Sequence, residues 1–168
     1  WAEIEALSER EEVLLGCADE ASEQRMKAVV DQALRTGDSV GGVFEVVAHG
    51  VPPGLGTYAN WDERLDGLLA AAVMSLQAVK AVEIGRGVTA ASAFGSVVHD
   101  AIHYRPEAQP EHHTRFAREQ NNAGGIEGGI SNGEDVIVRG YLKPISTLRR
   151  PLASVSLETR EETKAAYE

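Results

Sequence analysis

The segment Lys143-Pro144-Ile145-Ser146-Thr147 combines one cation, two hydroxyl groups and a proline that stiffens the backbone. An ammonium group supplies a point charge, and hydroxyl groups add directional donors, so the set suits a phosphomonoester. Serine and threonine are also common turn residues, and the same segment fits a capped turn with an exposed lysine. The segment is therefore a candidate phosphate site, with the plain turn as the alternative.

The run 121–133 holds five glycines in thirteen residues. Backbone without Cβ atoms can approach a flat or charged ligand closely, which makes the run a candidate ligand-binding element. Strand glycines also mark bulges, so a twisted hairpin remains an alternative. The run is not a dinucleotide-binding fingerprint, because no strand-to-helix transition is predicted after it.

The tetrapeptide Gln77-Ala78-Val79-Lys80 is expected at the C-terminal end of a long helix. Unsatisfied carbonyl groups and the helix dipole make a lysine favourable there, so ordinary helix termination explains this composition without a ligand. A zinc site is not expected, since zinc needs three or four converging ligands and Cys17 is the single cysteine. Of the five histidines, His112 and His113 are expected in solvent.

Composition and charge indicate which partners and which compartment suit the protein. The 168 residues include 26 acidic and 16 basic side chains, and the formal net charge of -10 disfavours nucleic acid and anionic membrane surfaces as partners. No apolar run reaches the length of a membrane span, and the N-terminal residues do not resemble a signal peptide. A single cysteine fits a reduced cytoplasm. Because the chain begins at Trp1, we expect a piece of a longer polypeptide.

The elements that must position these residues begin with a helix over 22–36, whose apolar residues recur at helical spacing and which Gly37 closes. Residues 41–48 predict a strand buried on most of both faces. Residues 49–56 predict an ordered loop, because prolines and glycines interrupt regular structure. Asn60 and Glu63 then suggest a capping box for a helix that continues to Leu76, the best core candidate, buried on more than one side.

The remaining elements are shorter. Residues 85–120 predict a short helix followed by a mobile loop. The runs 124–130 and 136–142 predict a hairpin joined at Asn132-Gly133. A last strand is expected over 152–157, and the charged tail 158–168 is helix-prone. Helices between antiparallel strands predict an α+β fold, with 1–168 as a single partial domain.

Several motifs, taken in order, resemble the chorismate synthase family. The resemblance runs from about Thr36 onward and is carried by Thr36-Gly37-Asp38-Ser39-Val40-Gly41-Gly42, His49-Gly50-Val51-Pro52-Pro53-Gly54-Leu55-Gly56, the segment 74–85, Gly95-Ser96 with His99-Asp100, the run 121–133 and the Lys143 segment. This chain resembles the C-terminal portion of the family.

The resemblance implies an activity and a fold. Chorismate synthases convert 5-enolpyruvylshikimate 3-phosphate to chorismate and phosphate by a 1,4-elimination that requires reduced FMN without net redox change. The flavin is reduced with NADPH by the enzyme itself or by a separate reductase, and the sequence leaves both open. The family fold is a β-α-β sandwich with shared inner helices, and the active enzyme is generally a homotetramer.

The resemblance also implies roles for individual residues. Gln77 and Ala78 are expected to contact the flavin, Gly128 to approach it closely, and Lys143, Pro144, Ile145, Ser146 and Thr147 to surround the FMN phosphate or its ribityl chain. The family often has asparagine at position 77, and glutamine keeps both amide functions.

The catalytic histidines, the substrate-binding arginines and the aspartate near the flavin belong to family motifs that these 168 residues do not contain. No catalytic residue is therefore assigned here, and the chain alone is expected not to turn over substrate. Without its partner layer, the helix ending at Leu76 is expected to be partly unburied. The alternatives are a non-catalytic module that binds FMN or another phosphorylated ligand, and a purely structural subunit.

Overall fold

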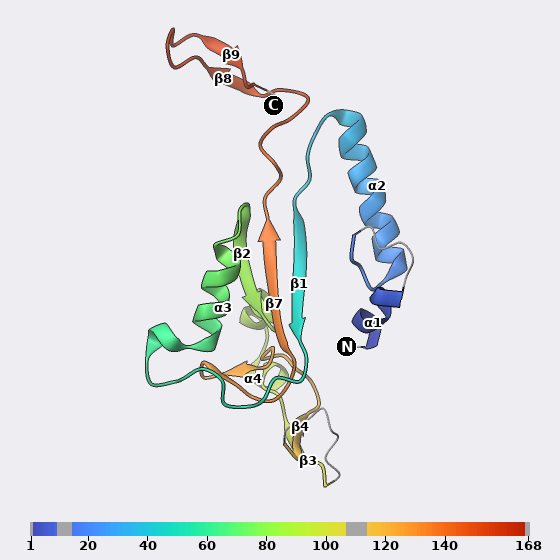
Figure 1. Cartoon of the computed structure of the whole chain (residues 1–168), viewed down its shortest axis with the longest axis vertical. Helices are drawn as coiled ribbons and strands as arrows, with labels where there is room; N and C mark the ends of the chain where they lie inside the picture. Colours follow the sequence, from blue (N-terminus) through green and yellow to red (C-terminus); the bar gives the residue numbers. More distant parts are fainter. Residues whose placement is uncertain (1, 10–14, 107–113, 167–168) are drawn as a thin grey trace. The chain divides into compact units, whose positions relative to one another are not determined.

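The computed structural model describes residues 2–9, 15–106 and 114–166 (Figure 1). The chain divides into two compact units, which are described separately: residues 1–42 with 143–168, and residues 43–142. The sequence expectation for His112 and His113 lies outside the described residues.

The first unit is built around the helix α2 (Glu20–Thr36), which follows α1 (Ala2–Glu5) and the 3-10 helix η1 (Ala6–Glu9). The Asp19 carboxylate caps α2 by accepting a 2.8 Å hydrogen bond from the amide of Ser22. Gly37 ends the helix in the left-handed conformation, with φ of 70°. The predicted helix and its glycine cap are therefore confirmed, and the helix begins two residues earlier than expected.

The C-terminal part of the first unit is a hairpin of β8 (Ala153–Val155) and β9 (Glu162–Lys164), which pair antiparallel. The predicted last strand is confirmed over its middle. The prediction of a helical tail is wrong, because the residues after 158 turn back and pair with β8. Arg160, with φ of 61°, donates its amide to the carbonyl of Ser156 and helps to close this turn.

The second unit contains a three-stranded sheet in the order β1 (Gly42–Ala48), β7 (Val136–Leu142), β2 (Val79–Ile84). β2 and β7 pair antiparallel, and the arrow of β1 also runs opposite to that of β7 (Figure 1). The prediction of a strand at β1 is confirmed. The prediction that it is buried on most of both faces is wrong, because β1 is an edge strand and Val43 remains 55% exposed.

Helix α3 (Leu65–Met74) packs beside this sheet and is preceded by the 3-10 helix η2 (Trp61–Glu63). The core consists of Ile126, Val136 and Val138, against which Val51, Leu65, Leu69, Val73, Val82 and Ile84 pack. The predicted capping box is wrong, because the Asn60 amide bonds the Glu63 carboxylate and caps no backbone amide. The prediction of burial on more than one side is also wrong, since Leu68 is 53% exposed.

The glycine-rich run forms a small hairpin of β5 (Ile126–Glu127) and β6 (Ile130–Ser131) around Gly128 and Gly129. Both glycines have positive φ, at 62° and 87°, as a two-residue hairpin turn requires. The predicted hairpin at Asn132-Gly133 is wrong, because β7 pairs with β1 and β2 and not with β6. The Asn-Gly pair instead directs the chain from the small hairpin into the sheet.

Residues 85–120 contain the 3-10 helix η3 (Gly87–Ser92) and the short helix α4 (Gly95–Val98), which confirms the predicted short helix. A further hairpin, of β3 (Ile102–Tyr104) and β4 (Phe116–Arg118), was not predicted. Tyr104 and Phe116 face each other across it with ring centroids 5.7 Å apart. Mixed helices and antiparallel strands confirm the α+β class. In the described ranges, none of the helices is both long and apolar enough to cross a membrane.

Candidate functional site

Gln77 and Ala78 form the turn between α3 and β2. The prediction that they belong to the helix end is wrong, because α3 ends at Met74 and is capped at Ser75. Gln77 is exposed, and Ala78 is half-buried with φ of 68°. A left-handed conformation costs a non-glycine residue about 1–2 kcal/mol, and such residues cluster at ligand-binding sites. The turn is therefore a strained feature directly before a strand.

The strand pair that follows this turn is irregular. Val79 pairs with Leu142 and Ala81 with Tyr141, so Lys80 is the extra residue of a β-bulge. Bulges change the direction of a strand and are frequent next to active sites. Lys80, which the sequence placed on a helix end, therefore lies in a bulged strand. Lys143 follows Leu142 directly in sequence, so two predicted segments adjoin one strand pair.

The segment from Lys143 to Thr147 is exposed and has no regular secondary structure. The Ser39 hydroxyl holds it by donating a 2.7 Å hydrogen bond to the carbonyl of Ile145. Within the described part of the chain, the Lys143 ammonium and the Ser146 and Thr147 hydroxyls have no protein partner. A cation and two unpaired hydroxyls in one short segment are available to an anionic ligand.

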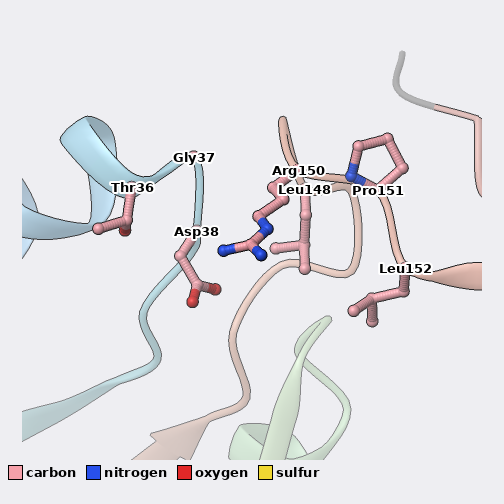
Figure 2. Close-up of a pocket in the computed structure, with 7 residues that line it drawn as sticks. All are labelled: Thr36, Gly37, Asp38, Leu148, Arg150, Pro151 and Leu152. Atoms are coloured by element: carbon pink, nitrogen blue, oxygen red, sulfur yellow. The ribbon is translucent and has the colours of Figure 1, made fainter.

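The chain after Thr147 lines a hollow of about 330 Å³ with the end of α2 (Figure 2). Its lining residues are Thr36, Gly37, Asp38, Leu148, Arg150, Pro151 and Leu152. The Arg150 amide donates a 3.0 Å hydrogen bond to the carbonyl of Gly37, and Figure 2 shows the Arg150 guanidinium directed toward the side chain of Asp38. A cation is favourable near a helix C-terminus. The sequence did not predict this hydrogen bond, since no local pattern relates Gly37 to Arg150.

The glycines of the run 121–133 have different surroundings. A Cβ atom on Gly124 would overlap the backbone of Gly85, and one on Gly125 would lie 2.5 Å from the carbonyl oxygen of Asp135. A Cβ atom on Gly129 would lie 2.9 Å from the carbonyl oxygen of Thr57. These three glycines are required by packing within the protein, as the hairpin alternative predicts. Gly128 differs, because an added Cβ atom would meet no atom of the described residues within 4 Å.

The structure does not bring Gly128 to Gln77. The amide of Leu65, the first residue of α3, donates a 2.9 Å hydrogen bond to the carbonyl of Gly129, so the glycine turn adjoins the start of the helix. The Gln77 turn follows its other end, and a helix of ten residues is about 15 Å long. Gln77 and Ala78 thus form one local element and Gly128 another.

Asp100 organises a network that the sequence reasoning did not assign. Its carboxylate accepts hydrogen bonds from the amides of Asn122 and Ala123, each 3.1 Å long, and from the Asn122 side chain at 2.8 Å. The Asn122 carbonyl accepts in turn from the Arg86 amide at 2.8 Å. The network fixes the close crossing of Gly85 and Gly124. The motif His99-Asp100 was the available signal, but its partner lies more than twenty residues away.

Polar and charged side chains pair across the strands of the three-stranded sheet. The Arg139 guanidinium donates to the Glu45 carboxylate at 2.5 Å, and the Tyr141 hydroxyl donates to the Glu83 carboxylate. This hydroxyl, together with the Val88 amide, lowers the pKa of Glu83, and the same carboxylate raises the pKa of Tyr141. Three strands are therefore joined by polar pairs as well as by their backbones. No cluster of three or more metal-ligating side chains occurs in the described residues.

Comparison with known proteins gives a consistent result. The family model described as chorismate synthase matches residues 2–168. The chorismate synthase of Acidobacterium capsulatum is 76% identical over 168 residues, which are 100% of this chain and 43% of that protein. The chorismate synthase of Koribacter versatilis is 67% identical over 168 residues, which are 100% of this chain and 42% of that protein.

A solved structure titled "Crystal Structure of Chorismate Synthase" aligns with a TM-score of 0.71 at 46% identity, over 79% of this chain and 38% of that chain. The chain thus spans about two fifths of the length of these relatives. The family model extends beyond the motifs that first indicated the resemblance and includes the N-terminal helices. The chain belongs to the chorismate synthase family.

Proposed function

We propose that this chain is part of a chorismate synthase, a lyase that eliminates phosphate from 5-enolpyruvylshikimate 3-phosphate to give chorismate. The observation that carries the proposal is 76% identity over all 168 residues to a protein named chorismate synthase. At this identity, the segments that surround a ligand are expected to keep their conformation.

The cofactor proposed is reduced FMN, which supplies electron density transiently during the elimination. The residues present fit such a group. Lys143 provides a cation for the phosphate, and the hydroxyls of Ser146 and Thr147 are unpaired within the described residues. Pro144 fixes one φ angle of this segment, and the hydrogen bond from Ser39 to the Ile145 carbonyl restrains it. An ordered segment loses less entropy when it binds its ligand.

The Gln77 and Ala78 turn is the proposed contact for another part of the cofactor. The exposed Gln77 amide offers both donors and an acceptor, and the strained conformation of Ala78 fixes the direction of the turn. Gly128 is proposed to let a planar group approach its backbone, since the space beside it is open. Because the two turns lie at opposite ends of α3, they would contact different parts of one elongated ligand or ligands of neighbouring subunits.

These 168 residues are proposed to act within a longer chain and a homotetramer, in the cytoplasm, with the flavin reduced either by the enzyme itself, using NADPH, or by a separate reductase. The exposed apolar surface of α3 supports the proposal that further protein covers this segment. Leu68 and Met74 of α3 and Leu76 just after it are about half exposed, although α3 is apolar on all sides beyond Asp66 in its first turn. Helices that are apolar all round are normally buried, so a further layer is expected to cover them. We also propose that the 168-residue chain alone does not turn over substrate.

The test uses the full-length protein, meaning this segment within a chain as long as its relatives. The purified protein, incubated anaerobically with reduced FMN and 5-enolpyruvylshikimate 3-phosphate, is expected to release equal amounts of chorismate and phosphate. The 168-residue chain, assayed beside it, is expected to release neither. FMN binding without product from the full-length protein would favour the non-catalytic binding module, and absence of FMN binding would leave the purely structural subunit.

A further inference from the structure

Arg118, at the end of β4, has a side chain that is only 10% exposed, which is unusual for a charged residue. Its guanidinium Nη2 donates to the Glu127 carboxylate, and Nη1 lies 3.4 Å from the carbonyl oxygen of Asn132. Its backbone amide donates a 2.9 Å hydrogen bond to the Glu134 carboxylate. One arginine thus contacts both ends of the small β5–β6 hairpin.

Further hydrogen bonds link the residues at the two ends of the β5–β6 hairpin. The Asn132 side-chain amide donates to the same Glu127 oxygen at 2.8 Å, and the Asn132 backbone amide donates to the carbonyl of Gly125 at 2.9 Å. Glu127 directly precedes Gly128, so these bonds hold the residue beside the open turn. On the other side of the turn, the Gly129 carbonyl accepts from Leu65. The Gly128 turn is therefore fixed from both sides.

The Arg118 side chain does not use all of its hydrogen-bond donors in the described structure. Its Nε–H is buried and has no hydrogen-bond partner among the residues that the structure describes. An unpaired buried donor costs free energy, and a buried ion pair is often no more stabilising than apolar residues of similar volume. Most buried polar atoms have partners, so this exception calls for a reason. The planar, two-pronged guanidinium gives a defined geometry between Glu127 and Asn132 that an apolar side chain cannot provide.

We propose that Arg118 is a positioning residue for the flavin site: it fixes Glu127, and through it the Gly128 turn, in the geometry that the cofactor requires. This inference rests on the proposed function, in which Gly128 approaches the flavin. It predicts that weakening the Arg118 contacts changes cofactor binding more than it changes the stability of the fold.

The test compares Arg118→Lys with Arg115→Lys in the full-length protein. Arg115 lies on the same hairpin and is exposed, with its Nη1 3.5 Å from the Tyr104 hydroxyl. Both substitutions keep the charge and remove the guanidinium. The measurements are FMN affinity from the quenching of flavin fluorescence, the circular dichroism of bound flavin, the melting temperature, and amide exchange of residues 126–131 without FMN.

For Arg118→Lys we expect faster exchange over 126–131, an altered flavin dichroism signal and a dissociation constant raised about tenfold, as for loss of one charge-assisted hydrogen bond. Arg115→Lys should change none of these. If Arg118→Lys does not fold, Glu127→Gln, which keeps the shape and removes the charge, should give the same three changes. Exchange or affinity unchanged from the unsubstituted protein would overturn the inference while leaving the proposed function intact. Failure of the unsubstituted protein to bind FMN would instead overturn the proposed function.

Discussion

Val79 of β2 pairs with Leu142 of β7 at the end of the sheet where the chain enters from Ala78 and continues into Lys143. Along the chain, Ala78 directly precedes Val79 and Lys143 directly follows Leu142, although Ala78 and Lys143 are 65 positions apart in sequence. The bulge at Lys80 lies between this pair and the next.

Lys143→Ala in the full-length protein should weaken FMN binding by about 1.5–3 kcal/mol, the contribution of one hydrogen bond to a charged group. The dissociation constant, measured by flavin fluorescence, should rise about tenfold to a hundredfold. Lys164→Ala is the matched control, since Lys164 is an exposed lysine on β9 and its substitution changes the net charge equally. Equal effects of the two substitutions on FMN affinity would show that residues other than Lys143 bind the FMN phosphate.

Gly124 and Gly128 offer a direct comparison, because both have φ of 62°. Alanine at either position takes on the left-handed strain of about 1–2 kcal/mol. Alanine at 124 would also overlap the backbone of Gly85, which adds about 1–3 kcal/mol of overpacking, whereas alanine at 128 meets open space. In urea unfolding, Gly124→Ala should therefore destabilise the protein clearly more than Gly128→Ala.

The same pair separates packing from ligand approach. Gly128→Ala should leave the fold intact and still weaken FMN binding, because the new methyl group occupies the face that the cofactor is proposed to approach. Wild-type FMN affinity in Gly128→Ala would remove Gly128 from the site. Equal destabilisation by the two substitutions would contradict the close crossing at Gly85.

The sequence predicts local features better than it predicts pairing. The helix ending at Gly37, the strand β1 and the loop before α3 follow from periodicity, a glycine cap and proline content, which act within a few residues. The hairpin at Asn132-Gly133 failed because two turn signals compete nearby, and Gly128-Gly129 forms the hairpin. Strand β2 was missed because Gln77-Ala78-Val79-Lys80 was interpreted as the end of the preceding helix, and only the pairing with β7 identifies the strand.

The candidate site shows the same limit. Motif resemblance selected Gln77, Gly128 and Lys143, but did not indicate that packing uses most of the neighbouring glycines. The contributions of Asp100 and Arg118 depend on hydrogen bonds to residues far along the chain, for which single-sequence patterns carry no signal.

The hydrogen bond between Tyr141 and Glu83 predicts a pH-dependent contribution to stability. The pKa of Glu83 lies below its ordinary 4.5 in the folded protein, so this contribution is complete above that value and is lost as pH falls through the lowered pKa. The pKa of Tyr141 lies above its ordinary 10.0, so the contribution is complete below that value and is lost as pH rises through the raised pKa.

Tyr141→Phe should accordingly be less stable than the unsubstituted protein between about pH 5 and 10, with a difference that shrinks toward both extremes. Urea unfolding measured within this range and also below and above it measures the difference. Tyr58→Phe is the control, because Tyr58 is 80% exposed and makes no hydrogen bond through its hydroxyl in the described structure. A difference that is constant with pH would show that the Tyr141 hydroxyl does not bond the ionised Glu83.

Ala78→Gly should stabilise the protein by up to about 1 kcal/mol. Glycine removes the left-handed strain of about 1–2 kcal/mol, and the greater freedom of the unfolded chain offsets about 0.4–1 kcal/mol of that gain. The same substitution at Ala81, three residues along in β2, should destabilise by about 0.5–1 kcal/mol, because Ala81 is paired with Tyr141 in the strand and does not have the positive φ of Ala78. Opposite signs in urea unfolding therefore identify Ala78 as the strained residue, and destabilisation by both substitutions would show that the turn holds no such strain.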